Sequence, residues 1–217
     1  MNESVEDYLR SMYSLYEQLN DKSKGIKASD LAVELGVTRS SVSAMAKRLV
    51  DLGYLHARAY SRLFFTHKGI IEAKRIMHNH RIIEVFLRRI LKRSVNKVHD
   101  EANRLEHAFS EESIRKLEKL LKYPEISPEG MNIPSKLGKV RIWLTLDLLD
   151  VGQSGKLVSI KTSSRLEKRL LAMGLVKGSK VTLERIAPLG DPIAIKVKGY
   201  SLSIRKKEAR KIVIEIS

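Results

Sequence analysis

The 217-residue sequence contains no cysteine. Disulfides, iron–sulfur clusters and thiolate-bound zinc are therefore excluded, and any bound metal ion must be held by histidine, carboxylate, amide or water ligands. Ligands of this kind favour Mn, Fe(II), Co, Ni or Zn over Cu(I). Long apolar runs are also lacking, because no stretch of the sequence approaches the roughly 18 apolar residues that a membrane helix needs.

Signals for export and for catalysis are scarce as well. The first residues are acidic and include no apolar segment of the kind found in signal peptides, so we expect a cytoplasmic protein without a membrane partner. The sequence has no nucleophile elbow, phosphate-binding loop or pair of catalytic acids, so we expect neither an enzyme nor a protein substrate. Hydrophobic residues make up 43% of the chain, which is enough to build the cores of about two or three small domains.

Acidic residues are fewer than basic residues. The sequence has 41 lysines and arginines but only 25 aspartates and glutamates, which gives a formal net charge of +16. Such an excess favours a polyanionic partner, because neutralising phosphates releases counterions; a solvated lysine-rich surface explains the charge equally well. The excess is uneven: residues 151–217 hold 15 basic and 5 acidic side chains, net +10, whereas residues 1–150 hold 26 and 20, net +6.

The N-terminal part has the pattern of a winged helix-turn-helix. A helix is predicted over residues 5–19, and two short helices follow that are joined at Gly36, with Ser29 and Thr38 as their N-caps. This helix–glycine–helix arrangement is typical of the helix-turn-helix motif. Residues 55–66 alternate around a polar centre, which predicts a β-hairpin, the wing.

The second helix of this motif is the predicted DNA-reading element. The N-terminal residues of such a helix reach base edges, and here they are small hydroxyl side chains and an arginine that can approach bases and phosphates closely. Capping the helix accounts for one hydroxyl, but the run is longer than capping requires. The predicted DNA-binding residues are Thr38, Arg39, Ser40, Ser41, Ser43 and Lys47.

Three further helices are predicted in the middle of the chain, and a break that contains proline and glycine follows them. The helices cover 67–91, 95–109 and 111–121, and the break covers 127–138. Beyond Val151 the sequence changes to short β-like runs between glycine and proline turns, with one helix at 163–174. About five strands in roughly 65 residues predict a small SH3-like barrel.

Two of the predicted helices carry potential metal ligands on a single face. The residues are His80 and Glu84, at i and i+4, and His99, Asn103, Glu106 and His107, at i, i+4, i+7 and i+8. Burying such a stripe is costly unless it binds something, and imidazole with carboxylate suits Mn, Fe(II) or Zn. A surface or capping role is the simpler explanation for any one of these residues. Six of them on adjacent helices favour a metal site.

Three segments of the sequence resemble the diphtheria-toxin-repressor family of iron- and manganese-dependent transcriptional regulators. They are HRIIE at 80–84, VHDEANRLEH at 98–107 and SPEGMNIP at 127–134. The segment 169–205 resembles the FeoA-type domain that this family often carries at its C-terminus.

The resemblance covers the whole chain and implies an α+β protein of three domains. These are an N-terminal winged helix-turn-helix DNA-binding domain (1–75), a helical dimerisation and metal-binding domain (76–145) and a C-terminal SH3-like small β-barrel of the FeoA type (146–217).

The resemblance also implies two metal sites. The primary ligands would be Asp7, Asn103, Glu106 and His107, and the ancillary ligands His80, Glu84 and His99. Arg81 would help to hold an anion. In some relatives the third domain also contributes ligands to the ancillary site. Here the carboxylate nearest to those positions in the sequence is Glu167.

The primary set departs from the family pattern at two positions. Asn103 stands where iron sensors have cysteine and manganese sensors have glutamate, so it matches neither, although its carbonyl oxygen can still act as a ligand. Arg10 stands where manganese sensors offer a second acid. The Asp7 carboxylate also has a simpler role, because an acid stabilises the first turn of a helix.

The function implied is that of a metal-dependent transcriptional repressor which controls metal-homeostasis genes. Fe(II) or Mn(II) would act as the corepressor that orders a homodimer for binding to double-stranded operator DNA, and Zn, Co or Ni are expected to substitute in vitro. The main alternative is a constitutive basic DNA-binding protein with a structural metal site, which would be insensitive to chelators. A metal-dependent enzyme and a metal-transport accessory are further alternatives, but neither accounts for the helix-turn-helix.

Overall fold

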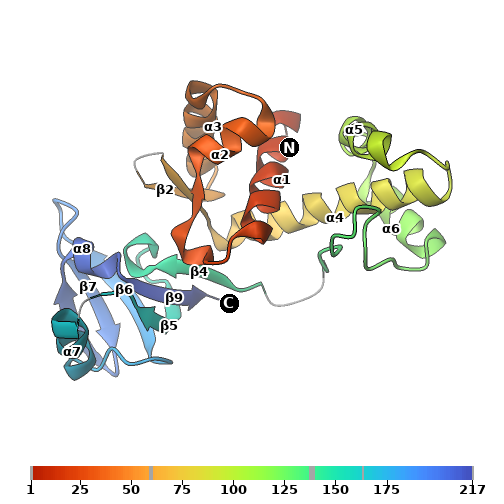
Figure 1. Ribbon diagram of the computed structural model, residues 1–217. Coiled ribbons are helices and arrows are strands. Elements are labelled where there is room, and N and C mark those ends of the chain that lie inside the picture. Colours follow the sequence, from red (N-terminus) through yellow and green to blue (C-terminus); the bar gives the residue numbers. More distant parts are fainter. Residues whose placement is uncertain (1, 59–60, 137–139, 163, 217) are drawn as a thin grey trace.

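Figure 1 shows the computed structural model, which describes residues 2–58, 61–136, 140–162 and 164–216. An N-terminal helical part lies beside the start of one long helix, two further helices lie at the other end of that helix, and a C-terminal sheet lies below (Figure 1). The predicted α+β fold class is confirmed. None of the helices that the structure describes has the length and apolar character needed to cross a membrane.

The N-terminal part is a winged helix. Its elements are α1 (Glu3–Gln18), η1 (Lys22–Lys24), β1 (Ile26–Lys27), α2 (Ala28–Leu35), α3 (Arg39–Asp51), β2 (Leu55–Arg58) and β3 (Arg62–Phe65). The strands form an antiparallel sheet in the order β1-β3-β2. The predicted wing is the β2–β3 hairpin, and its residues 59–60 lie outside the described part of the chain.

The turn between α2 and α3 follows the predicted pattern. Gly36 ends α2 in the left-handed conformation, with φ +65°, and the Thr38 hydroxyl accepts a hydrogen bond from the Ser41 amide as the N-cap of α3. The prediction that Ser29 caps α2 is wrong. The chain turns into the helix directly after β1, so α2 begins at Ala28, and Ser29 lies in its first turn, where its hydroxyl bonds to Asp30.

The long helix α4 (His67–Arg89) connects two hydrophobic cores. Its first half packs against α1 in the core of the winged helix, which includes Leu9, Met12, Leu31, Leu49, Leu63, Ile70, Ala73 and Ile76. Its second half packs against α5 (Val95–Leu105) and α6 (Glu111–Leu120) in a smaller core. That core contains Ile82, Ile83, Val85, Leu87, Val98, Ala102, Ile114 and Leu121. The same helix therefore supports the DNA-binding part and the metal-ligand stripe.

The helix predicted over 95–109 is shorter than expected. α5 ends at Leu105, Glu106 is its C-cap, and residues 106–108 form a turn in which the Ala108 amide bonds to the Leu105 carbonyl at 2.9 Å. Ser110 then caps α6, as predicted, by accepting a hydrogen bond from the Ser113 amide. Ser110 has extended backbone angles, so α6 begins as a separate helix.

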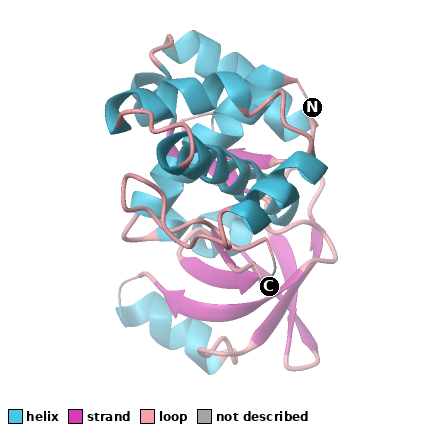
Figure 2. Ribbon diagram, turned by 90° about the vertical axis from the view of Figure 1, so that its right-hand side faces the viewer, coloured by secondary structure: helices cyan, strands magenta, loops and turns pink. Residues whose placement is uncertain are grey.

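The C-terminal part is a twisted antiparallel sheet with two short helices (Figure 2). Its elements are β4 (Ile142–Thr145), η2 (Leu146–Leu148), β5 (Ser154–Ile160), α7 (Ser164–Ala172), β6 (Lys180–Ile186), β7 (Ile193–Val197), β8 (Tyr200–Ile204), α8 (Lys206–Ala209) and β9 (Ile212–Ile216). Across the described residues the strand order is β4-β9-β5-β6-β7-β8. The five strands expected after Val151 are present, and β4 adds one from before it. This SH3-like domain agrees with the prediction.

The C-terminal domain is joined to the winged helix by both apolar and ionic contacts. Ile142 and Leu144 of β4 belong to the same hydrophobic cluster as Phe64 of the wing. Arg58 of β2 donates to the carboxylate of Asp147, with distances of 2.8 and 3.0 Å from Nη2 to the two carboxylate oxygens. The boundaries predicted at 75/76 and 145/146 remain predictions; the first falls inside α4 and the second directly after β4.

Candidate metal centre and DNA interface

His80, Glu84 and His99 form the first cluster of potential ligands. One turn of α4 separates His80 from Glu84, and α5 packs across them so that His99 completes the group. His80 Nε2 lies 3.0 Å from Glu84 Oε1 and 3.2 Å from His99 Nδ1. His99 Nδ1 lies 3.1 Å from Glu84 Oε1. The side chains of His80 and Glu84 are buried, whereas that of His99 is 44% exposed. Three ligand atoms so close together could hold one metal ion.

Both buried groups of this cluster favour their charged forms in the metal-free chain. Burial alone would raise the pKa of Glu84, but hydrogen bonds with His80 and His99 outweigh burial and hold it at about 2. Burial lowers the pKa of His80, and contacts with the carboxylates of Glu106 and Glu84 outweigh burial and raise it. The carboxylate is therefore ionised, as a metal ligand must be, whereas His80 would have to release the proton of Nε2 when a metal ion binds.

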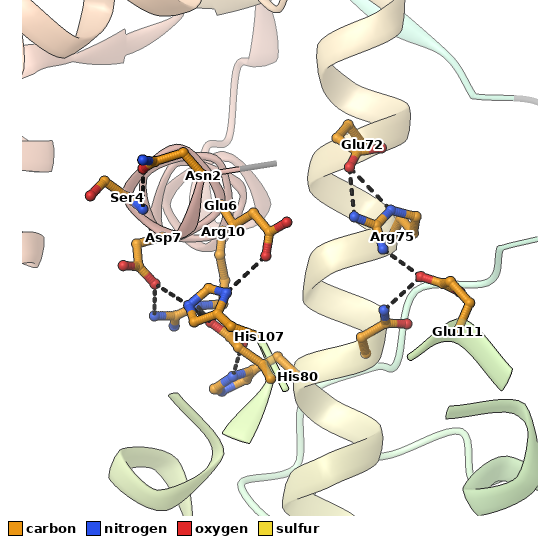
Figure 3. A network of polar contacts seen from close by, with 12 residues as sticks. Asn2, Ser4, Glu6, Asp7, Arg10, Glu72, Arg75, His80, His107 and Glu111 are labelled. Atoms are coloured by element: carbon orange, nitrogen blue, oxygen red, sulfur yellow. Dashed lines mark hydrogen bonds and ion pairs between the residues drawn. The ribbon is translucent and has the colours of Figure 1, made fainter. Parts of the chain in front are cut away.

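Asp7, Glu106 and His107 form the second cluster, between α1 and the end of α5 (Figure 3). His107 Nε2 lies 3.3 Å from Asp7 Oδ1 and 3.7 Å from Glu106 Oε1. On its other side, His107 Nδ1 lies 2.8 Å from Glu6 Oε2, which orients the imidazole so that Nε2 faces the other two ligands. The role of Glu6 was not predicted, because the sequence gives no sign that His107 contacts both neighbours on α1.

One hydrogen bond joins the two clusters. His80 Nδ1 lies 2.7 Å from Glu106 Oε2, and both side chains are 2% exposed. Because an ionised carboxylate only accepts hydrogen bonds, the proton of this contact lies on His80 Nδ1. His80 Nε2 is thereby directed at Glu84 and His99, so Glu106 orients a ligand of the other cluster.

Asn103 supplies an oxygen that fits a cation. Its Oδ1 is buried and has no hydrogen-bond partner among the described residues. On α5, Asn103 lies one turn after His99 and one turn before Glu106 and His107. It lines a cavity of about 370 Å³ together with Arg10, His80, Glu84 and His99. A buried carbonyl oxygen without a partner is costly, and coordination of a metal ion would satisfy it.

Two expectations about residues around these clusters are corrected. Arg81 does not leave its guanidinium free for an anion, because Glu17 of α1 binds it through both carboxylate oxygens, at 3.1 and 2.6 Å. Glu167 is not near the ancillary cluster, because it lies on α7 at the far side of the C-terminal domain from α5 (Figure 1). The C-terminal domain is docked on the wing instead.

The predicted DNA-binding residues all lie exposed at the start and along one side of α3. Thr38 serves as the cap, and its Oγ1 also lies 2.8 and 2.9 Å from the hydroxyls of Ser40 and Ser41. Beside them, a hollow of about 480 Å³ between the helix-turn-helix and the wing is lined by Lys27, Ser29, Arg39, Ser43, Ser61 and Arg62. Its cationic and hydroxyl groups suit contact with a phosphate backbone.

Family models match nearly all of the chain. Residues 1–63 match the N-terminal DNA-binding domain of the iron dependent repressors, and residues 66–135 match the iron dependent repressor metal-binding and dimerisation domain. Residues 144–216 match the FeoA domain.

The chain is also similar to curated repressors and to solved structures. It is 31% identical over 192 residues to the diphtheria toxin repressor of Corynebacterium glutamicum, with 87% of this chain and 78% of that protein covered. It is 35% identical over 123 residues to the HTH-type transcriptional regulator MntR of Bacillus subtilis, with 56% of this chain and 82% of that one covered.

Among solved structures, the manganese regulator SloR is 28% identical, with a TM-score of 0.54 and 98% of each chain covered. The metal-dependent transcriptional regulator MtsR is 26% identical, with a TM-score of 0.55 over the full length of both chains. With its DNA-binding, metal-binding and FeoA domains in this order, the chain belongs to the diphtheria toxin repressor family of iron-dependent repressors and is a metal-dependent transcriptional repressor that controls metal homeostasis.

Proposed function

We propose that this repressor takes Fe(II) or Mn(II) as its corepressor and binds double-stranded operator DNA as a homodimer. The observation that carries the proposal is the meeting of α1, α4 and α5 at two linked clusters of nitrogen and oxygen ligands. Both clusters are free of thiolates, and the oxygen-rich primary set suits either metal. Structures of the relative ScaR with bound Zn²⁺ and with bound Cd²⁺ support the expectation that other divalent metals substitute in vitro.

The residues proposed to hold the ions follow the two clusters. The primary ligands are Asp7, Asn103, Glu106 and His107, and the ancillary ligands are His80, Glu84 and His99. A bound ion supplies two positive charges that balance the ligand carboxylates and satisfy the Asn103 oxygen.

Binding of the ion would affect the DNA-binding part through the helices that supply its ligands. Asp7 belongs to α1, whose apolar face is part of the winged-helix core, whereas Glu106 and His107 follow the smaller core at the other end of α4. Holding Asp7 against these two residues therefore restricts the orientation of α3 relative to the dimerisation helices. A coupling of about 1–3 kcal/mol changes DNA affinity by roughly 5- to 150-fold.

The DNA surface of the proposal consists of the exposed residues of α3. Recognition would use Thr38, Arg39, Ser40, Ser41, Ser43 and Lys47, with Arg62 of the wing beside them. The hydroxyls are short, so α3 must approach the bases closely, and the cations contribute affinity that depends on salt.

Fluorescence anisotropy on labelled DNA from upstream of the chain's own gene tests the proposal. The titration is run with chelator, Mn(II), anaerobic Fe(II) and Zn(II), each at two salt concentrations. We expect tight binding with Mn(II) or Fe(II) that survives the higher salt, and its loss with chelator. Binding that ignores metal and collapses in salt would instead identify a constitutive basic DNA-binding protein with a structural metal site.

Variants locate the effect in the primary cluster. Asp7→Ala and Glu106→Ala are expected to lose the metal-dependent gain in DNA affinity. Asp7→Ala should disturb the fold less, because the Asp7 side chain is 38% exposed. Glu112→Ala is the matched control, since Glu112 is 67% exposed and its ion pair among the described residues is with Lys116 on the surface of α6. If both ligand variants retained metal-dependent DNA binding, the proposed ligand set would be wrong.

A further inference from the structure

A cation that belongs to the chain itself lies against the primary cluster. Arg10 follows Asp7 by one turn of α1, and its side chain is only 10% exposed. Its Nε donates to Glu106 Oε1 at 3.0 Å, and its Nη2 lies 3.8 Å from Asp7 Oδ1 (Figure 3). Arg10 therefore forms ion pairs with two of the three clustered ligands.

The oxygen that Arg10 contacts is the one that faces the other ligands. Glu106 Oε1 is 3.7 Å from His107 Nε2, whereas Glu106 Oε2 is turned to His80. A metal ion held by Asp7, Glu106 and His107 would have to share Glu106 Oε1 with the guanidinium. Of the two negative charges that the ligand carboxylates bring, Arg10 balances one before any metal arrives.

We propose that Arg10 sets the metal threshold of the primary cluster by acting as a built-in counter-ion. This inference rests on the proposed function of the cluster. The guanidinium keeps Asp7 and Glu106 together at low metal concentration, and its charge opposes the entry of a divalent cation. Arg10 thus lowers the affinity of the site, so that the repressor responds to a higher concentration of metal than Asp7, Asn103, Glu106 and His107 alone would require.

A purely structural role for Arg10 makes the opposite prediction. If the ion pairs served only to hold α1 against α5, their removal would disorder the ligands and weaken metal binding. If Arg10 competes with metal, removal of its charge strengthens metal binding even though the metal-free protein becomes less stable. The sign of the change in affinity therefore separates the two roles.

The test measures the Mn(II) dissociation constant of the full chain by competition with a fluorescent chelator, for the unmodified chain, Arg10→Gln and Arg10→Lys. Glutamine keeps a hydrogen-bond donor for Glu106 but removes the charge, and we expect Mn(II) to bind about tenfold more tightly. Lysine restores the charge, so its affinity should stay close to that of the unmodified chain. Thermal melting of metal-free Arg10→Gln should begin at a lower temperature, and Mn(II) should raise its midpoint by more.

Arg75→Gln is the matched control. Arg75 lies on α4 and pairs with Glu72 and Glu111, so this change removes the same charge without touching a ligand (Figure 3). We expect Arg75→Gln to leave the Mn(II) affinity unchanged. Unchanged or weaker binding by Arg10→Gln, with the unmodified chain binding normally, would overturn the inference alone. Absence of Mn(II) binding by the unmodified chain, and of Fe(II) binding under anaerobic conditions, would overturn the proposed function and the inference with it.

Discussion

The carboxylate of Glu106 uses each of its oxygens for a different part of the molecule. Oε1 accepts from Arg10 and faces His107, and Oε2 accepts from His80. Only 2% of the side chain is exposed, so solvent screens these interactions little. Changes in charge at the primary cluster therefore reach the ancillary cluster through one residue, and effects of substitutions at the two clusters should not be additive.

Besides Glu84, a second carboxylate with a lowered pKa is that of Glu111 at the start of α6. Burial would raise the pKa of Glu111, but hydrogen bonds from Asn79, Lys136 and Arg75 outweigh burial and lower it to about 2. A carboxyl group with a lowered pKa stabilises the fold above its ordinary pKa of 4.5, and that contribution is lost as pH falls from there through about 2. Glu111→Gln should therefore make the loss of stability with falling pH less steep in this window, and Glu84 accounts for part of the remainder.

The expected loss at neutral pH is roughly 1 kcal/mol, because 44% of the Glu111 side chain is exposed and solvent screens its pairs. Urea denaturation at several pH values between 2 and 7 measures the effect. Glu112→Gln, at the exposed neighbouring position, should leave the profile unchanged. An equally steep acid loss in both variants would show that other carboxylates control it.

The grouping of ligands could be predicted from the sequence, but most of their partners could not. Helical spacing places His80 with Glu84 and His99 with Asn103, and only the resemblance to a family adds Asp7. The contacts of Arg10 with Glu106, and of Arg81 with Glu17, join side chains that are far apart in the sequence. No local pattern encodes such pairs, because they depend on how α1 crosses α4 and α5.

At the scale of elements, the start of α4 depends on a glycine. Thr66 caps the helix by accepting a hydrogen bond from the Gly69 amide, and Gly69 itself lies against the chain before β2. A Cβ at Gly69 would overlap the backbone carbonyl of Tyr54. The close approach of this loop to α4 therefore requires glycine.

Gly69→Ala separates two opposing effects. Helix propensity alone favours alanine by up to about 1 kcal/mol. Overlap with backbone atoms, which move less readily than a side chain, should outweigh this gain and leave a net loss of about 1–3 kcal/mol in the free energy of unfolding. We therefore expect a net loss of stability in urea denaturation. A raised midpoint would mean that the loop moves away at little cost.

The long amphipathic helices and the wing were predicted within a few residues, whereas one short strand was not. β4 (Ile142–Thr145) was missed because its partner is β9, far along the chain, whereas the equally short β2 and β3 form a hairpin that local alternation reveals. Residues 194–204 include two of the five expected strands, since Lys198 and Gly199 both have positive φ and turn the chain between β7 and β8. α5 is shorter than predicted because the turn at 106–108 is stabilised by backbone hydrogen bonds that the apolar spacing does not reveal.

For the whole molecule, the key contact is that between the wing and the C-terminal domain. The side chain of Asp147 is 2% exposed and accepts hydrogen bonds from Arg58, from Thr145 and, at 3.3 Å, from Arg210. Arg58 is thus neutralised by the C-terminal domain and is not free to contact DNA in this arrangement. A second ion pair joins Lys161 to Asp21, the N-cap of η1.

Asp147→Asn should loosen this contact between the domains. Loss of the carboxylate leaves Arg58 without its buried charge partner, which should cost about 2 kcal/mol. We expect an earlier first transition in urea denaturation and a larger radius of gyration in small-angle X-ray scattering. Asp150→Asn, at an exposed carboxylate nearby, serves as the control. An unchanged radius of gyration would indicate that the apolar contacts of β4 are sufficient to hold the two domains together.

Because α4 is one continuous helix, a small change of its tilt at the ligand clusters moves its first residues by a larger distance. His80 lies thirteen residues from the first residue of α4, a distance of roughly 20 Å along the axis. A tilt of about 5° at the ligand clusters would therefore displace the start of the helix, and the winged helix packed on it, by roughly 2 Å. In the proposed homodimer, two such displacements in opposite directions would change the separation of the two copies of α3 by about the 3.4 Å rise between base pairs, and with it the bases that they face.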